Sequence, residues 1–151
     1  MPIALHSSFH ASDALFAALS VLIFIALCSL LQEPSRRNFN AILVGGAGAA
    51  YLSGGGLGPW ELAFTAVMAF CAYRGLRSYR FIGLAWILHT LWDLVHHFNG
   101  HPIIPFIPNS SEGCAITDTL LAIWFFAGAP AVFTWRRESP NRTGSPTAYS
   151  S

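Results

Sequence analysis

The sequence predicts an all-α protein, built as a polytopic membrane bundle of five transmembrane helices. Three observations lead to this prediction. Hydrophobic residues make up 54% of the 151 residues and charged residues only 10%, whereas an average soluble domain is about 25% charged. Five apolar stretches approach the ~20 residues that a helix needs to cross a bilayer. All the basic residues are arginines, and they alternate with those stretches.

The five predicted spans follow one another with short loops between them, at residues 13–31, 39–53, 60–76, 81–98 and 114–135. The second is short and rich in small residues. In it Gly45 and Gly46 are each followed four residues later by alanine, a spacing typical of close helix packing. Pro130 is expected to kink the fifth span. Residues 1–135 are therefore predicted to form one transmembrane bundle, and the polar residues 136–151 a disordered cytoplasmic tail.

The arginines predict the orientation of the bundle. They lie between spans one and two, between spans three and four, and after span five, as Arg36, Arg37, Arg74, Arg77, Arg80, Arg136, Arg137 and Arg142. Short cytoplasmic loops collect basic residues, so we expect the N-terminus outside and the C-terminus inside. All the histidines and most carboxylates then fall in the outer half. The expected location is the inner (plasma) membrane of a bacterium.

Composition also excludes several classes of protein. A disordered chain needs low hydrophobicity, and three cysteines are too few, and odd in number, for a disulfide scaffold. No basic stripe stands on a soluble face, so a nucleic-acid partner is not expected. The expected partners are membrane lipids, and a homodimer is left open.

The fourth span carries the polar residues that favour chemistry. His89, Asp93, His96 and His97 fall within an arc of roughly 100° on a helix that turns ~100° per residue. Ionisable groups at such depth are costly and normally face the interior of the bundle. The sequence therefore predicts one polar site on the inward face of this helix.

Two carboxylates on other spans are expected to reach the same level. Asn109 and Glu112 have the spacing of a capping box, so the fifth helix should begin near Ser110 and place Asp118 two turns inside it. Glu61 falls in the first turn of the third helix. Histidine with carboxylate favours a divalent cation, zinc first, with iron or manganese as alternatives.

The spacing along the helix gives a predicted set of ligands. We expect Asp93, His97 and Asp118 to bind the metal, with His96 or Glu61 as the fourth ligand. The expected catalytic acid and base are His89 and His96, with His89 behind the ligands as a proton relay.

Each residue also has a structural interpretation. Glu61 complements a helix dipole, Asp93 and Asp118 are hydrogen-bonded packing residues, and His101 is a solvated interface residue. Prolines at every third position from residue 102 to 108 predict an extended segment that covers the site as a lid.

Two runs carry a resemblance to known proteins. They are Trp86-x2-His89-x2-Trp92-Asp93-x2-His96-His97-x2-Gly100-x-Pro102 and Pro108-x-Ser110-Ser111-x-Gly113-Cys114-Ala115-Ile116-x-Asp118. Together they resemble a family of small bacterial membrane proteins of unknown function, over residues 60–130. The resemblance supports grouping the His and Asp residues as one site and implies no activity. A looser similarity is to alkaline-ceramidase-like membrane hydrolases, which bind zinc through His and Asp inside a helical bundle but have seven spans and another motif.

These observations favour a metal-dependent hydrolase that acts on a lipid or lipid-like substrate at the outer leaflet. Three alternatives stay open. One is a component that binds or transports metal ions or protons. Another is haem ligation, which would need a dimer because the histidines inside spans all lie on one helix. The last is a structural protein whose polar cluster only fixes helix packing.

Overall fold

The computed structural model describes residues 11–53, 56–99 and 110–133. Within these residues the chain forms five α-helices and one short 3-10 helix, and no strand. In chain order they are α1 (Ala11–Ser29), α2 (Ser35–Ala49), η1 (Ala50–Ser53), α3 (Pro59–Gly75), α4 (Tyr79–Phe98) and α5 (Ser110–Phe126). The prediction of an all-α protein with five helices is confirmed.

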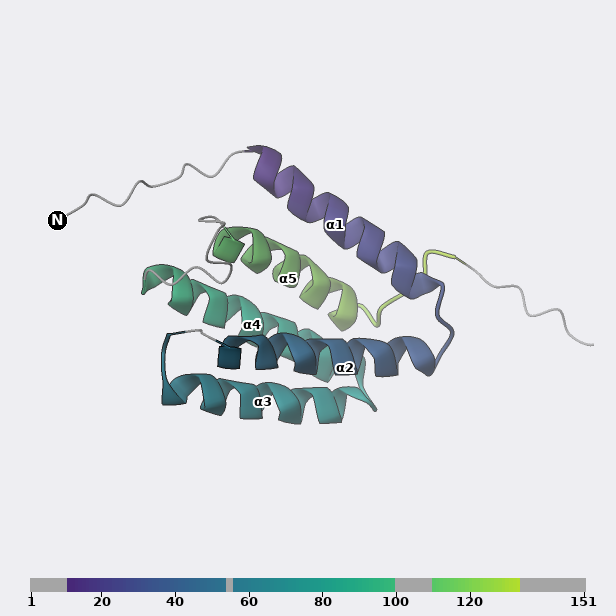
Figure 1. The fold of residues 1–151 in the computed structure, drawn as a ribbon. Coiled ribbons are helices and arrows are strands. Elements are labelled where there is room, and N and C mark those ends of the chain that lie inside the picture. Colours follow the sequence, from purple (N-terminus) through teal and green to yellow (C-terminus); the bar gives the residue numbers. More distant parts are fainter. Residues whose placement is uncertain (1–10, 54–55, 100–109, 134–151) are drawn as a thin grey trace, which may run out of the picture.

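The helices run up and down, each antiparallel to the one before it (Figure 1). α4 is the central helix, since it packs against α2, α3 and α5. α1 lies at the side of the bundle and packs along α5. Because α4 packs against three helices, polar side chains on its inward faces are buried inside the bundle.

One end of α5 was predicted correctly and the other was not. The helix begins at Ser110, as the capping-box spacing predicted, but ends at Phe126 rather than near residue 135. Gly128 has a φ of 87°, and the amide of Ala129 donates to the carbonyl of Trp124 at 2.9 Å, so the end forms a Schellman motif. Pro130 lies beyond this end, so the predicted kink is wrong; a proline soon after a helix end is common because it cannot continue a helix.

Small residues let α2 approach α3 closely. A Cβ on Gly48 would lie 2.6 Å from Cγ of Met68, and one on Gly45 would lie 3.0 Å from Cβ of Ala72. The small-residue prediction is therefore confirmed for Gly45, but it is wrong for Gly46, which has no neighbour within 4 Å. The second predicted span also ends differently, because α2 stops at Ala49 and the chain tightens into η1.

Length and hydropathy together separate α1 from the other helices, since α4 is as long, with 20 residues, but is less apolar. In the described part of the chain, residues 12–29 form the one helix that is long and apolar enough to cross a membrane by length and composition. A shorter apolar helix covers Gly113–Phe126. α2, α3 and α5 have 15, 17 and 17 residues, fewer than the ~20 of a standard span. The arrangement with five spans therefore stays a prediction.

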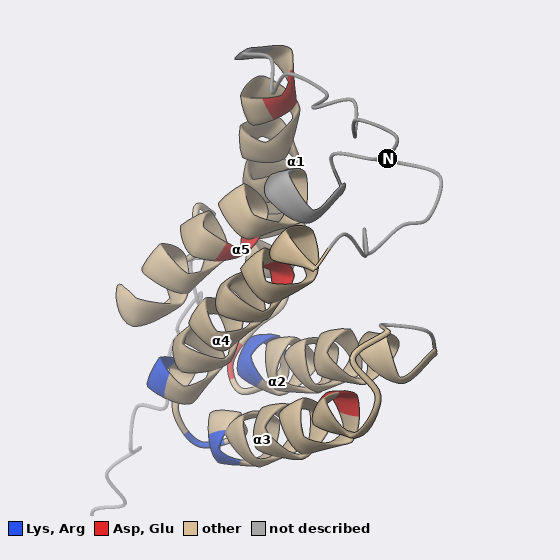
Figure 2. Cartoon of the chain, turned by 90° about the vertical axis from the view of Figure 1, so that its left-hand side faces the viewer, with Lys and Arg blue, Asp and Glu red and all other residues tan. Residues whose placement is uncertain are grey.

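The charged residues separate along the bundle. The described arginines lie where α2 begins and where α3 passes into α4, and Figure 2 shows these positions together in blue at one end. Acidic residues of α3, α4 and α5 lie farther along the helices, as Glu61, Asp93 and Asp118. The separation agrees with the alternation seen in the sequence.

A small cluster fixes the turn at the arginine end. Arg36 donates to the Glu33 carboxylate at 2.8 Å, and the hydroxyl of Tyr79 also donates to it. Burial raises the pKa of Glu33, but these two hydrogen bonds outweigh it and hold the pKa below its usual value. Burial, with the hydrogen bond to Glu33, raises the pKa of Tyr79 to about 12. The cluster ties the α1–α2 turn to the start of α4.

The glycines of α2 give a matched pair of variants. Gly48→Ala is expected to lower the free energy of unfolding by about 1–3 kcal/mol, because the added methyl overlaps the Met68 side chain. Gly46→Ala adds the same methyl to the same helix in open space and should be neutral or stabilising by up to ~1 kcal/mol. Thermal unfolding of both proteins in one detergent measures the difference. Equal melting temperatures would contradict the packing described for α2 and α3.

Candidate metal centre between α4 and α5

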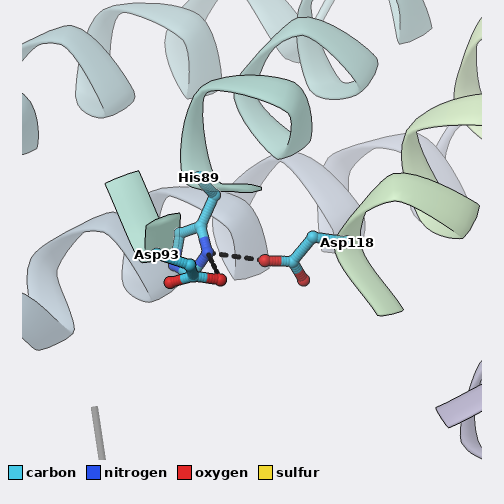
Figure 3. A group of neighbouring side chains, drawn as sticks. All are labelled: His89, Asp93 and Asp118. Carbon is cyan, nitrogen blue, oxygen red and sulfur yellow. Dashed lines mark hydrogen bonds and ion pairs between the residues drawn. The ribbon is translucent and has the colours of Figure 1, made fainter. Parts of the chain in front are cut away.

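Three buried side chains meet where α4 faces α5. Nδ1 of His89 lies 2.7 Å from Oδ2 of Asp118 and 3.6 Å from Oδ2 of Asp93. One possible ligand atom from each residue lies within 4.8 Å of the others, and Figure 3 shows the imidazole held between the two carboxylates. His89 and Asp93 are one turn apart on α4, so the helix itself brings them together. We call these three residues the His89 cluster.

The Asp93 carboxylate has a hydrogen-bond donor on one oxygen only. Its Oδ1 accepts a hydrogen bond from the hydroxyl of Tyr51 in η1, while its Oδ2 is buried and has no hydrogen-bond partner in the described residues. Asp93 is 0% exposed. A buried carboxylate oxygen without a donor is costly, so this atom is a natural place for a cation or a proton.

A second polar pair lies one turn farther along α4. Nε2 of His96 lies 3.2 Å from Oε1 of Glu61, an ion-pair distance without hydrogen-bond geometry. Oε1 of Glu61 accepts from the amide of Leu57 at 3.2 Å, and its Oε2 accepts from the indole of Trp92 at 3.0 Å. Glu61 is therefore oriented by donors on both oxygens and faces the His96 imidazole.

Tyr51 joins the two parts of the site. Its ring lies 5.2 Å from the ring of His89 and 4.9 Å from the ring of His96, centroid to centroid. Tyr51 is 4% exposed. The phenol ring thus occupies the space beside both imidazoles, while its hydroxyl reaches Asp93. The 3-10 turn after α2 carries this residue to the centre of the site.

The charges of the buried site do not balance. Three buried carboxylates, Asp93, Asp118 and Glu61, are accompanied by two buried imidazoles, His89 and His96. Even with both imidazoles protonated, one negative charge stays in excess. Buried charge without compensation is strongly destabilising. The site therefore needs an additional positive charge, either a bound cation or a proton on one carboxyl group.

The His89 cluster fits a divalent metal by its chemistry. One imidazole nitrogen and two carboxylate oxygens are ligands that zinc accepts, and iron or manganese accept the same atoms. Three protein ligands leave a position for water, which is the pattern of catalytic zinc sites rather than closed structural ones.

The structure brings together most of the predicted site residues and corrects two roles. Asp93 and Asp118 lie in the His89 cluster, as predicted, and Glu61 and His96 form the neighbouring pair. His97 is exposed, so it does not belong to the predicted ligand set. At ~100° per residue it lies roughly 80° around α4 from His89, too far to face α5. His89, predicted as a relay behind the ligands, lies between the two carboxylates in the structure, and the metal roles of these residues stay a prediction.

Other predictions fall outside the described residues. The lid at residues 102–108, His101 and the tail at 136–151 are among them, and so is the Glu112 side chain. These predictions stay untested.

Sequence reasoning missed two residues of the site. Tyr51 was included in the second span and given no role, and Trp92 was noted only within a resemblance. The helical phase of Trp92, one turn before His96, was a signal for it. Tyr51 carried a weaker signal, because its position depends on the tightening of the chain into η1.

The comparisons with known proteins give a family. The model of a family of unknown function, DUF6010, matches residues 12–131. The chain belongs to this family, which confirms the expectation of a family of unknown function. No curated protein and no solved structure matches the chain.

The Tyr51 hydroxyl offers a test of the polar network. Tyr51→Phe keeps the ring beside both imidazoles but leaves Oδ1 of Asp93 without its donor, so the free energy of unfolding should fall by about 1–3 kcal/mol. Tyr79→Phe removes a hydroxyl from the more exposed Glu33 carboxylate and should cost less. Thermal unfolding of the two variants compares them. A larger loss in Tyr79→Phe would argue against the buried hydrogen bond.

Proposed function

We propose that this protein is an integral membrane bundle with a divalent metal, zinc first, held by His89, Asp93 and Asp118, and that it acts as a metal-dependent hydrolase on a lipid or lipid-like substrate. The observation that carries the proposal is the buried His89 cluster, whose ligand atoms lie within 4.8 Å of one another. The lack of a hydrogen-bond donor to Oδ2 of Asp93 and the excess negative charge support a bound cation at this place.

The distribution of apolar side chains supports a membrane location. Large hydrophobic side chains are exposed on every helix, among them Phe16, Ile42, Trp60, Phe98 and Ile123, each 60% or more exposed. Soluble monomers rarely expose contiguous apolar patches larger than a few hundred Å². The arginines at one end add the pattern of cytoplasmic loops. We propose five spans in a plasma membrane, with the shorter helices in a thinned or tilted arrangement.

The proposed chemistry assigns separate roles to the buried residues. His89, Asp93 and Asp118 would hold the metal, which would supply Lewis-acid chemistry, lowering the pKa of a water and polarising the oxygen of an ester or amide. His96 lies one turn outward and takes the proton of the attacking water, while Glu61 orients its imidazole. The water oxygen bonds to the carbonyl carbon as this proton leaves, the bond between the carbonyl carbon and the leaving group then breaks, and His96 returns the proton to the leaving group.

A non-catalytic role is the second candidate, and one observation favours it. The hydrogen bond between His89 and Asp118 already joins α4 to α5 without an ion, so the cluster could serve only to fix helix packing. A path for transport has less support. From His89 toward the arginine end, the buried side chains of α4 are apolar or aromatic, as Trp86, Ala85 and Ile82, whereas transport needs polar steps through the bilayer.

Metal content tests the proposed site directly. Protein purified in detergent should hold close to one equivalent of zinc, iron or manganese by plasma mass spectrometry. Asp93→Asn and Asp118→Asn should lose it, because each removes an anionic ligand at nearly unchanged volume. His97→Ala is the matched control on the same helix and should keep the metal, since His97 is exposed.

The same measurement separates the two candidates. Size-exclusion profiles and melting temperatures first establish that the variants are folded. Wild-type protein that stays free of metal after zinc is added back would exclude the hydrolase proposed here and leave the packing role.

His96 tests the catalytic part of the proposal. A long-chain p-nitrophenyl ester in detergent micelles serves as the probe. His96→Gln should reduce the hydrolysis rate by about 10²- to 10⁴-fold, as expected for a general base, and should keep the metal. His97→Gln should keep both the rate and the metal. A His96→Gln protein as active as the wild type would remove this residue from the reaction.

A further inference from the structure

An apolar groove runs between α3 and α4 on the surface of the bundle. It has a volume of about 320 Å³. Its walls are formed by Trp60, Ala63 and Val67 of α3 and by Leu88, Leu91 and Val95 of α4. Its walls therefore offer carbon surface and no charged group.

The long axis of the groove follows the helix axes. α3 and α4 are antiparallel, so Trp60 and Val95 lie at one end and Val67 and Leu88 at the other. Seven residues of helix span ~10 Å. The Trp60 end lies at the level of Glu61 and His96, since these residues directly follow Trp60 and Val95 in the chain.

Two aromatic rings separate the groove from the polar site. Phe64 and Trp92 stack with their centroids 4.7 Å apart and form the floor of the groove. On their inner side, Phe64 lies 6.3 Å from the ring of His89 and Trp92 lies 6.0 Å from the ring of His96. The indole N–H of Trp92 donates inward to Glu61. The groove and the site are thus one ring apart.

We propose that this groove binds one hydrocarbon chain of an amphiphile, with its polar head at the level of Glu61 and His96. The inference rests on the proposed function for its membrane setting, and it deepens that function by naming a substrate class, a lipid with at least one long acyl or alkyl chain. The chain enters sideways from the bilayer, between α3 and α4.

The size, chemistry and direction of the groove select this occupant. A helix with side chains is about 10–12 Å wide, which is too large for a groove of about 320 Å³. A polar ligand would find no partner on the walls, and unpaired polar groups in such a place are costly. An acyl chain lies along the bilayer normal, as the groove does in a bundle of spanning helices. Trp60, 70% exposed at the outer end, suits the headgroup level.

Photolabelling tests the groove. The protein is reconstituted in phosphatidylcholine vesicles with a fatty acid that carries a diazirine in its chain, irradiated, digested and analysed by peptide mass spectrometry. We expect labels on the groove segments, residues 60–67 and 88–95, to saturate and to be competed by unlabelled palmitate. Ala63→Trp fills the groove and should reduce this labelling severalfold. Ala69→Trp adds the same ring to an exposed position of α3 away from the groove and should label like the wild type.

The outcomes decide the inference separately from the proposed function. Labels spread evenly over the exposed apolar residues of all helices, or unaffected by palmitate, would overturn the groove as a binding site. So would equal labelling of the Ala63→Trp and Ala69→Trp proteins. Metal content, measured on the same samples, reports on the His89 cluster. A competed label in protein without metal would support binding in the groove and contradict the proposed hydrolase. Metal without a competed label would support the metal site and contradict binding in the groove.

Discussion

The burial of three carboxylates in a chain without lysine is the constraint on which the rest of the structure depends. Asp93, Asp118 and Glu61 lie inside the bundle, and the described arginines lie at its other end. Among the described residues, imidazoles, a phenol, an indole and the amide of Leu57 reach the carboxylates. The helices therefore have to hold donors against each oxygen, and η1, α3, α4 and α5 each supply part of this polar network. Oδ2 of Asp93, buried and without a hydrogen-bond partner in the described residues, marks where the network is incomplete.

The central position of α4 follows from the same constraint. His89, Asp93 and His96 occupy successive turns of one face, so that face has to meet η1, α3 and α5. Small residues make this approach possible on both sides. Gly75 of α3 admits Ile82 of α4, whose Cγ1 would lie 2.8 Å from an added Cβ, and Gly83 of α4 lies against Phe126 of α5, whose ring would meet an added Cβ at 3.2 Å. The close packing of α4 against its neighbours therefore also brings the polar groups together.

The sequence alone predicted the helices better than the side chains around the site. Long apolar runs with few charged residues predict where the helices lie. The inward positions of Asp93 and Asp118 were predicted from their helical phase and from their place along the helices. The same reasoning did not predict which of His89 and His97 is buried. The two differ by less than a quarter turn, and the contact with α5 decides which one is buried. Tyr51 depends on a local tightening of the chain, and the end of α5 depends on the positive φ of Gly128, which hydrophobic pattern does not reveal.

The marginal position of α1 has a consequence for how the molecule tolerates change. α1 packs along α5, and it supplies none of the side chains of the His89 cluster, the Glu61–His96 pair or the groove. Its buried residues are small, Ala17, Val21, Cys28 and Ser29, while its leucines and Phe16 are exposed and Phe24 is partly buried against the core. The polar side chains of the His89 cluster and the Glu61–His96 pair thus all come from the other helices. In the membrane location proposed above, the exposed face of α1 could change to suit a thicker or thinner bilayer while the geometry around His89 stays the same.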